Sequence, residues 1–506
     1  MTADPLVPTD ALVVDEDRSW STEQAWDLID RLAHRAREAA FADPTAPRRV
    51  AVFAENAGPA VLAHVGGLRS GASVVAVSAH LNGTDAADLL ERADVALVIA
   101  GPRTHEAARQ AAALAAGQTG RPCHVRCWTD PDWEPWLAAA PAGPPADDRS
   151  IAPNLLFTSG TTGRPKATEL PPNVFPRRDS WAQWLEATRA NRFVGLGRHL
   201  VVAPLHHTGP LNAVRALAAG TSVGILGRFD PARMLHAIET WSIASTTVVP
   251  THLSRLLTLP QAVRDAADVS TLRLVFLTGA ACPIDVKREI IEWWGPVVLE
   301  AYGATEVGVT CSITSEDWLA HPGSVGRSVA PYRAVVMDEA GHELPADQEG
   351  HLYFVDDTGR GVVYHRDPTA SGSAHTRPGV FTLGEIGRVD QDGWVYVTDR
   401  FADMVVTGGV NVYPAEVEQV LATHPEVADV AGVGLPHPDL GEQLVALVVP
   451  RDPASPPAVT DLDAWCQVRL SRYKCPRQIR LVQSLHRSDL GKLDKRGLRA
   501  TQLDPT

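Results

Sequence analysis

A stretch rich in hydroxyl groups and glycines joins Leu155 to Lys166, with the sequence LLFTSGTTGRPK. Glycines let a backbone approach phosphate oxygens, and hydroxyl and amide groups donate hydrogen bonds to them. The lysine adds a compact positive charge. Pro165 stands where the Walker loop has glycine, so this is a different pattern. On the residues alone, an ordinary polar surface loop competes with a phosphate-binding loop. The candidate residues of the phosphate-binding loop are Thr158, Ser159, Gly160, Thr161, Thr162, Gly163 and Lys166.

Lysine is rare in this chain. Only five of the 46 basic residues are lysines, and the others are arginines. The planar fork of arginine does not suit a site that needs a compact charge, so each remaining lysine is a candidate for a special role. This reasoning points to Lys166 and to Lys492 near the C-terminus.

The elements that hold these residues begin with alternating strand-like and helix-like segments. Such alternation is typical of parallel strands covered by helices. The expected strands are 49–55, 72–77, 95–100, 200–203, 222–226, 245–249 and 274–277, and the expected helices are 57–68, 85–93 and 104–116.

The later part of the chain changes character twice. Short segments between residues 335 and 397, separated by glycine and aspartate, predict an antiparallel, barrel-like part. Beyond residue 400, a helix at 414–422 and paired strands at 427–434 and 443–449 predict a small α+β domain. The predicted fold class is therefore α/β plus α+β. A large N-terminal domain of parallel-sheet α/β subdomains with the barrel-like part covers residues 1–400, and a small mobile C-terminal domain covers 401–506.

Composition excludes several classes of partner. The net charge of -14 and the absence of a basic cluster argue against nucleic acid. No apolar run approaches the roughly 18 residues that span a bilayer, and the N-terminus lacks the pattern of a secretory signal. Six scattered cysteines are typical of a reducing compartment. We expect a cytoplasmic monomer or homodimer that binds neither nucleic acid nor membrane.

The loop at 155–166 resembles the signature loop of the adenylate-forming superfamily, which includes acyl- and aryl-CoA synthetases, adenylation domains of peptide synthetases, and luciferases. This resemblance favours the phosphate-binding loop over the surface loop. Other segments are similar to further elements of this family, in the family order. They are the adenine-binding turn at 278–281, the YGxTE element at 302–306, the ribose-binding and domain-joining segments at 382–387, 392–393 and 399–400, the start of the C-terminal domain at 408–411 and 414–418, and the final lysine motif at 491–492.

The resemblance implies that the protein binds ATP with Mg²⁺ and activates a small acid as its AMP derivative. Glu306 would bind Mg²⁺, as a hard cation prefers a carboxylate. Thr305 would bind the α-phosphate, and Lys492 would balance charge that develops at the α-phosphorus. Glu385 and Arg400 would bind the ribose. The adenine site would be formed by Gly279, Ala280, Ala281 and Tyr302.

The acid pocket and the thiol site are also implied by the resemblance. His207 is similar to an aromatic residue that borders the acid pocket, and Trp184, Val249 and Gly303 are further candidates; together they favour a compact acid, which could be aromatic. For CoA, the turn at Gly408 and Gly409 would let the pantetheine arm pass. Lys474 and Arg477 would contact its phosphates.

The chain departs from the family pattern at three places. Lys166 is followed by Ala167, Thr168 and Glu169 in place of glycine and an apolar pair; Glu385 replaces an aspartate; and Ala402 stands at the hinge.

Three readings follow from the pattern and its departures. An acid:CoA ligase is the leading hypothesis. The alternatives are adenylation with another acceptor, such as a carrier protein or an amine, including activation of nitrite to diazotise an aromatic amine, and a non-catalytic nucleotide-binding protein.

Overall fold

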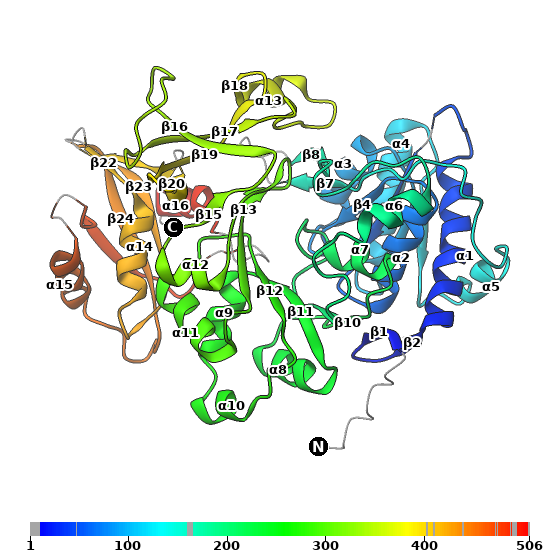
Figure 1. Cartoon of the computed structure of the whole chain (residues 1–506), viewed down its shortest axis with the longest axis horizontal. Coiled ribbons are helices and arrows are strands. Elements are labelled where there is room, and N and C mark those ends of the chain that lie inside the picture. Colours follow the sequence, from blue (N-terminus) through cyan, green and yellow to red (C-terminus); the bar gives the residue numbers. More distant parts are fainter. Residues whose placement is uncertain are drawn as a thin grey trace. The chain divides into compact units, whose positions relative to one another are not determined.

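The computed structural model of the chain (Figure 1) describes residues 11–46, 48–158, 165–400, 403–407, 410–437, 440–470, 472, 474–485, 487 and 493–503. For residues 400, 406, 410, 411 and 441 the description covers the backbone alone. The chain forms two compact units. The first unit comprises Met1–Thr278, Arg288–Val309 and Val362–Ser373, and the second comprises Gly279–Lys287, Thr310–Gly361 and Ala374–Thr506. The domain boundary at residue 400 stays a prediction.

The first unit contains a six-stranded sheet in the order β6-β5-β3-β4-β7-β8. All neighbouring strands are parallel except the β7–β8 pair, which is antiparallel. The strands are β3 (Arg49–Phe53), β4 (Val74–Val77), β5 (Val95–Ala100), β6 (His124–Cys127), β7 (Leu155–Thr158) and β8 (Lys166–Glu169), and the accompanying helices are α1 (Thr22–Ala40), α2 (Gly58–Arg69), α3 (Gly83–Arg92), α4 (His105–Thr119) and α5 (Trp133–Ala138). The predicted alternation of strands and helices is confirmed here.

A second sheet of the first unit has the order β2-β1-β10-β9-β11-β12-β13 and is parallel except for its β1–β2 pair. Its strands are β1 (Ala11–Asp15), β2 (Ser19–Ser21), β9 (Arg198–Val201), β10 (Val223–Ile225), β11 (Ile243–Val248), β12 (Leu274–Leu277) and β13 (Val298–Ala304). The helices along this stretch are α6 (Trp181–Thr188), α7 (Asn212–Ala218), α8 (Pro231–Thr240), α9 (Pro250–Leu257), α10 (Gln261–Ala266) and α11 (Ile284–Trp294).

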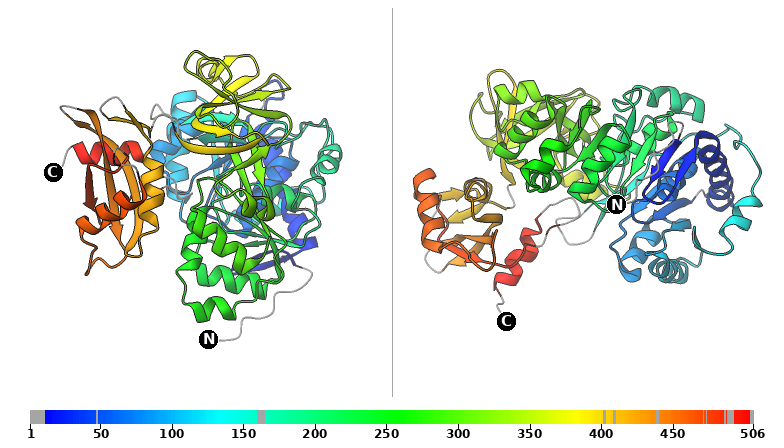
Figure 2. Two further views of the ribbon diagram at one scale, coloured as in Figure 1. Left: turned by 60° about the vertical axis from the view of Figure 1, so that its left-hand side comes forward. Right: turned by 90° about the horizontal axis from the view of Figure 1, so that it is seen from below.

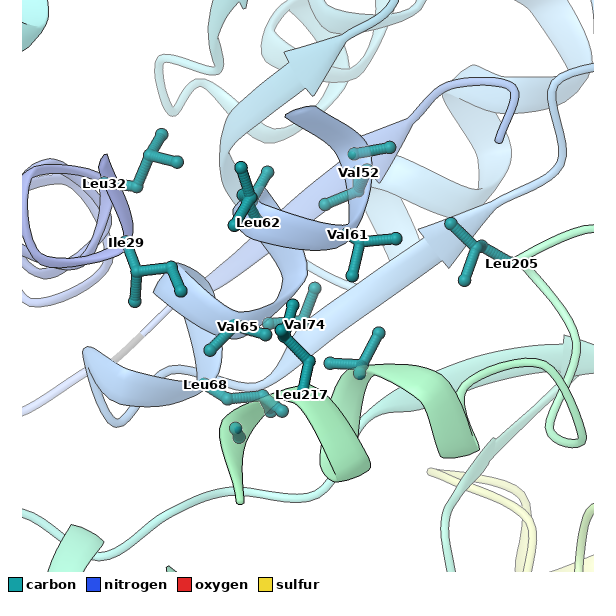
Figure 3. Close-up of a cluster of buried hydrophobic side chains, with 14 of the residues drawn as sticks. Ile29, Leu32, Val52, Val61, Leu62, Val65, Leu68, Val74, Leu205 and Leu217 are labelled. Carbon is teal, nitrogen blue, oxygen red and sulfur yellow. The ribbon is translucent and has the colours of Figure 1, made fainter. Parts of the chain in front are cut away.

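The core of the first unit is built around helix α2. Every residue from Ala60 to Leu68 is buried, so this helix is covered on all sides. A helix with such a composition belongs inside a protein. Figure 3 shows Leu62 and Val65 of α2 among side chains from α1, β3, β4 and α7. This shared core fixes the two sheets of the unit as one scaffold for the residues at the ends of their strands.

The second unit begins with antiparallel strands in the order β14-β15-β20-β19-β17-β16, with β18 beside β19. The elements of this stretch of chain are β14 (Gly308–Ile313), α12 (Ser315–Ala320), β15 (Gly326–Ser328), β16 (Tyr332–Met337), β17 (Gly350–Asp356), α13 (Pro368–Ser373), β18 (His375–Arg377), β19 (Val380–Val389) and β20 (Trp394–Arg400). The predicted change to antiparallel strands in this stretch is confirmed.

The C-terminal part of the second unit is an α+β sheet structure, drawn in orange and red in Figure 2. Its strands follow the order β22-β21-β24-β23, and β25 pairs with β24 in parallel. Its elements are β21 (Val405–Thr407), β22 (Val410–Val412), α14 (Pro414–Ala422), β23 (Val427–His437), β24 (Gly441–Pro450), α15 (Val459–Arg469), β25 (Gln478–Leu481) and α16 (Lys495–Leu503).

Alternate residues of β24 enter different cores in this part. Leu444, Ala446 and Val448 pack with residues of α14 and α15, whereas Val445 and Leu447 pack with Leu498 of α16. The period of two places helices on both faces of the sheet. The predicted small α+β fold is therefore confirmed, and its mobility stays a prediction. No helix in the described ranges combines the length and apolar character needed to cross a membrane.

Candidate active site

The turn after strand β13 sets the direction of Glu306. A Cβ atom on Gly303 would lie 1.9 Å from the carbonyl oxygen of Gly308, so the chain can reverse this tightly only with glycine. Gly308 has a φ of +78°, which also favours glycine. The side-chain amide of Asn173 donates to the carbonyl oxygen of Val307 at 3.0 Å. The turn is thus braced from both sides.

The carboxylate of Glu306 meets the strand that leads into the predicted phosphate loop. Thr158 is the last residue of β7, and its Oγ1 donates to Oε1 of Glu306 at 3.0 Å. Glu306 is only 8% exposed. Both residues therefore lie at the C-terminal ends of parallel strands of the first unit, which is where α/β sheets bind ligands.

Tyr364 links Glu306 to Lys166. The phenol of Tyr364 forms a side-chain hydrogen bond with Glu306, and the Lys166 ammonium lies 4.6 Å from the centre of the Tyr364 ring. Burial and the negative charge of Glu306 raise the pKa of Tyr364 above its ordinary value, so the phenol stays neutral and can donate. We did not single out Tyr364 from the sequence, although the scarcity of tyrosine, with seven in the chain, was a usable signal.

The unusual residues after Lys166 hold the segment that carries Tyr364. The hydroxyl of Thr168 donates to the carbonyl oxygen of Val363 at 2.9 Å, and the backbone amide of His365 donates to the carbonyl oxygen of Ala167 at 2.7 Å. The departure from the family pattern in strand β8 therefore has a structural consequence inside the first unit.

On the other side of Glu306, two threonines meet. The Oγ1 atoms of Thr208 and Thr305 lie 2.8 Å apart, so the residue predicted to bind the α-phosphate is joined to the loop that carries His207. His206 and His207 have ring centres 4.1 Å apart. Burial, with a smaller effect of His80, lowers the pKa of His206 to about 4, so its ring is neutral at pH 7.

Two other residues predicted for the acid pocket, Trp184 and Val249, are buried. Trp184 is 0% exposed and its ring stacks on Trp181 at 5.1 Å, with Phe175 at 5.3 Å. It therefore belongs to the hydrophobic core and lines no open surface. Val249 is 2% exposed and precedes the first residue of α9.

In the second unit, the predicted ribose-binding residues occupy opposite positions on neighbouring strands. Glu385 of β19 pairs in register with Arg400 of β20, and Glu385 is 8% exposed. Gly279, Ala280 and Ala281 also belong to this unit, where both alanines are exposed, whereas Tyr302 belongs to the first unit and is half-buried.

The candidate CoA residues in the C-terminal part lie in different surroundings. The ammonium of Lys474 pairs with Glu416 at 2.6 Å, whereas Arg477 is exposed. A second ion pair joins Lys495 to Glu418 at 2.9 Å. Predicted residues that lie outside the described part are Ser159, Gly160, Thr161, Thr162, Gly163, Ala402, Gly408, Gly409 and Lys492, together with the side chain of Arg400.

Two family models match most of the chain. The model for AMP-binding enzyme matches residues 6–358, and the model for the AMP-binding enzyme C-terminal domain matches residues 416–492. The first match alone covers more than half of the sequence, and it includes Thr158, Lys166 and Glu306.

Relatives and solved structures agree with the family models. The chain is 31% identical over 510 residues to a 3-[(3aS,4S,7aS)-7a-methyl-1,5-dioxo-octahydro-1H-inden-4-yl]propanoyl:CoA ligase of Mycobacterium tuberculosis, covering 97% of this chain and 96% of the relative. It is 32% identical over 397 residues to a feruloyl-CoA synthase of an Amycolatopsis species, covering 78% of this chain and 77% of the relative.

Two solved structures cover nearly the whole chain. ATP-bound MatB from Rhodopseudomonas palustris aligns with a TM-score of 0.81 at 26% identity, covering 98% of this chain and 97% of the other. The amide bond synthetase McbA from Marinactinospora thermotolerans aligns with a TM-score of 0.79 at 26% identity, covering 97% and 96%.

These findings confirm the predicted superfamily, fold class and enzyme class, an ATP-dependent adenylate-forming ligase of the acid–thiol type. The non-catalytic alternative loses its support, and none of the relatives named above favours diazotisation. Together, the strand-end cluster around Glu306 and the two family matches show that the chain belongs to the AMP-binding enzyme family.

Proposed function

We propose that this protein activates a compact carboxylic acid with ATP, forming an acyl-adenylate and pyrophosphate, and then transfers the acyl group to the thiol of CoA. The observation that carries the proposal is the contact between Thr158, at the entrance to the phosphate loop, and the buried carboxylate of Glu306. Phosphates held by the loop would lie beside that carboxylate and beside the positive charge of Lys166.

The residues around Glu306 fit a Mg²⁺ ion that accompanies ATP. A carboxylate and a hydroxyl oxygen are hard donors of the kind that Mg²⁺ binds. The contacts of Glu306 described above are with hydroxyl groups, and none of them is with a thiol or another soft ligand. When bound, such an ion neutralises negative charge on the phosphates. Glu306 would hold it, and Thr158 would orient the carboxylate.

The acid would enter from the side of Thr208 and Thr305. In the hydroxyl pair at 2.8 Å one hydroxyl donates to the other, and the accepting hydroxyl keeps its own proton to donate to an α-phosphate oxygen. Lys492 would then balance charge on the α-phosphate as the new C–O–P bond forms and the bond to pyrophosphate breaks. His207, beside the neutral ring of His206, would border the apolar part of the acid.

Transfer to CoA would rest on the C-terminal part of the chain. Arg477 is exposed and can meet a phosphate of CoA, while Lys474 would first have to leave Glu416. The named CoA ligases support this acceptor, and the amide bond synthetase makes an amine the second candidate. We place the reaction in the cytoplasm, where both ATP and CoA occur, and the choice between monomer and homodimer stays a prediction.

The test is pyrophosphate release from ATP and Mg²⁺ with a panel of aryl and aliphatic acids, each with and without CoA or an amine. Sustained release that requires an acid and CoA, with a thioester found by mass spectrometry, is the expected result. Release that depends on an amine and yields an amide would show that an amine, and not CoA, is the acceptor. Binding of ATP without pyrophosphate release under any condition would contradict the proposal.

A further inference from the structure

The segment 363–365 is held along strand β8 by polar contacts with three consecutive residues of that strand, Ala167, Thr168 and Glu169. The carbonyl oxygen of Val363 accepts from the hydroxyl of Thr168 at 2.9 Å, and the backbone amide of His365 donates to the carbonyl oxygen of Ala167 at 2.7 Å. The ring of His365 also lies 3.7 Å from the Glu169 carboxylate. Tyr364 lies between Val363 and His365, so the backbone that carries its side chain is held on both sides.

Glu169 is itself fixed by two arginines. Its Oε1 lies 3.4 Å from the guanidinium of Arg49, and its Oε2 lies 2.7 Å from that of Arg177. Arg49 begins β3, in the interior of the same six-stranded sheet. The guanidinium of Arg49 also lies 3.5 Å from Nε2 of His365, so the segment that carries Tyr364 contacts the interior of this sheet.

We propose that Tyr364 is a positioning residue of the nucleotide site. Its hydroxyl orients the Glu306 carboxylate, and its ring positions the Lys166 ammonium. The inference rests on the proposed function for the roles of Glu306 and Lys166. Tyr364 itself needs no contact with ATP.

The two contacts of Tyr364 are of different physical kinds and can be removed separately. The hydrogen bond to Glu306 requires the hydroxyl, whereas the attraction between the Lys166 ammonium and the ring requires only the aromatic face. Tyr364→Phe removes the first contact and keeps the second. Tyr364→Leu removes both.

A hydrogen-bonded partner that orients a metal-binding carboxylate affects metal affinity by about 10- to 100-fold. We therefore expect Tyr364→Phe to raise the Mg²⁺ concentration that half-saturates ATP binding by about tenfold. Saturating Mg²⁺ should restore the affinity for ATP to within about twofold of the wild type, because the ring still sets Lys166. Tyr364→Leu should also weaken ATP binding at saturating Mg²⁺.

The experiment is calorimetric titration of the full-length protein with ATP over a series of Mg²⁺ concentrations, for wild type, Tyr364→Phe, Tyr364→Leu and Tyr353→Phe. Tyr353 lies in β17 of the second unit, so Tyr353→Phe is a matched control that removes a phenol hydroxyl outside the site. Melting temperatures of all four proteins separate a folding defect from a site defect. The assay needs no acid, so it does not depend on knowing the acid substrate.

An unchanged Mg²⁺ requirement in Tyr364→Phe would overturn the proposal, even if the variant were less stable. A wild-type protein that binds no ATP would overturn the proposed function and this inference together, whereas normal wild-type binding with no effect of Tyr364→Phe would overturn this inference alone.

Discussion

Two carboxylates, Glu306 buried and Glu418 half-buried, show how the two units of this protein use charge. Glu306 in the first unit accepts hydrogen bonds from the hydroxyls of Thr158 and Tyr364, whereas Glu418 in the second unit pairs with the ammonium of Lys495 at 2.9 Å and accepts the amide of Gly432 at 2.6 Å. A hydroxyl can turn toward another acceptor at small cost, but separating a partly buried ion pair costs more. Glu306 is therefore suited to take up a cation, and Glu418 is suited to anchor the fold.

The lysines also divide between the candidate site and the surroundings that stabilise the fold. Lys287 is 0% exposed and lies over the ring of Trp318 at 4.5 Å, while Lys474 and Lys495 form ion pairs. Lys166 lies against the Tyr364 ring. Scarcity of lysine thus indicates residues in special surroundings, and several of those surroundings are structural. It does not by itself separate a catalytic lysine from an anchoring one.

The largest expected effect breaks the structural ion pair. Burial alone would lower the pKa of Lys495, but Glu418, Asp399 and Asp403 raise it above its ordinary value, so Lys495 is charged at pH 7. Lys495→Met leaves the half-buried Glu418 without this partner, which should lower the unfolding free energy measured in urea by up to about 3 kcal/mol. The double variant Glu418→Leu, Lys495→Met should recover most of that loss. Equal loss in both proteins would show that the ion pair is not the cause.

The next effect concerns Lys492, which stays a prediction from the sequence. Lys492→Ala should slow adenylation by on the order of a hundredfold or more, because one donor to the transition state is lost. Single-turnover formation of the adenylate measures this step without CoA. Arg472→Ala removes an exposed positive charge in the same part of the chain and should leave the rate unchanged. If the two variants behave alike, Lys492 has no part in the chemistry.

Acid should weaken the first unit before the second. Burial lowers the pKa of His64, His199 and His252 to about 3, and all three belong to the first unit. These groups bind protons more readily when unfolded, with a pKa of about 6.5, so their stabilisation is complete above that pH and is lost as the pH falls toward 3.

By pH 5, the protonation linkage of each of these histidines should lower the free energy of unfolding by on the order of 1–2 kcal/mol. Hydrogen exchange followed by mass spectrometry between pH 7 and 5 should show protection falling first in peptides of the first unit. Earlier loss in β23 and β24 would contradict this assignment.

The smallest effect concerns the ribose position. Glu385→Asp shortens the side chain by one methylene at a position whose backbone pairs with that of Arg400 in the neighbouring strand. The carboxylate remains able to accept from both ribose hydroxyls, so the KM for ATP should change by less than about tenfold. Glu385→Leu, which removes both acceptors, should raise the KM further. Equal values for the two variants would remove Glu385 from the ribose site.

The parallel strands and the C-terminal α+β fold could be predicted from the sequence, because hydrophobic period is a local signal. Thr158, Lys166 and Glu306 were selected with the help of the family resemblance, and their roles stay predictions. Tyr364 could not be predicted in this way, because it lies about 200 residues from Lys166 in a segment that the pattern assigned to the barrel-like part. Trp184 was assigned to the pocket, yet it packs in the core, since an aromatic residue near a site motif has no local signal that separates the two environments.

The most direct test of the central claim is acid-dependent exchange of labelled pyrophosphate into ATP, measured without CoA. Exchange requires reversible formation of an acyl-adenylate, so it isolates the adenylation step from the transfer to CoA. The wild type should exchange in the presence of Mg²⁺ and an accepted acid, and Glu306→Gln should lose on the order of a hundredfold or more of that activity. Glu316→Gln, an exposed control in α12, should exchange like the wild type. Full exchange in Glu306→Gln would contradict the account.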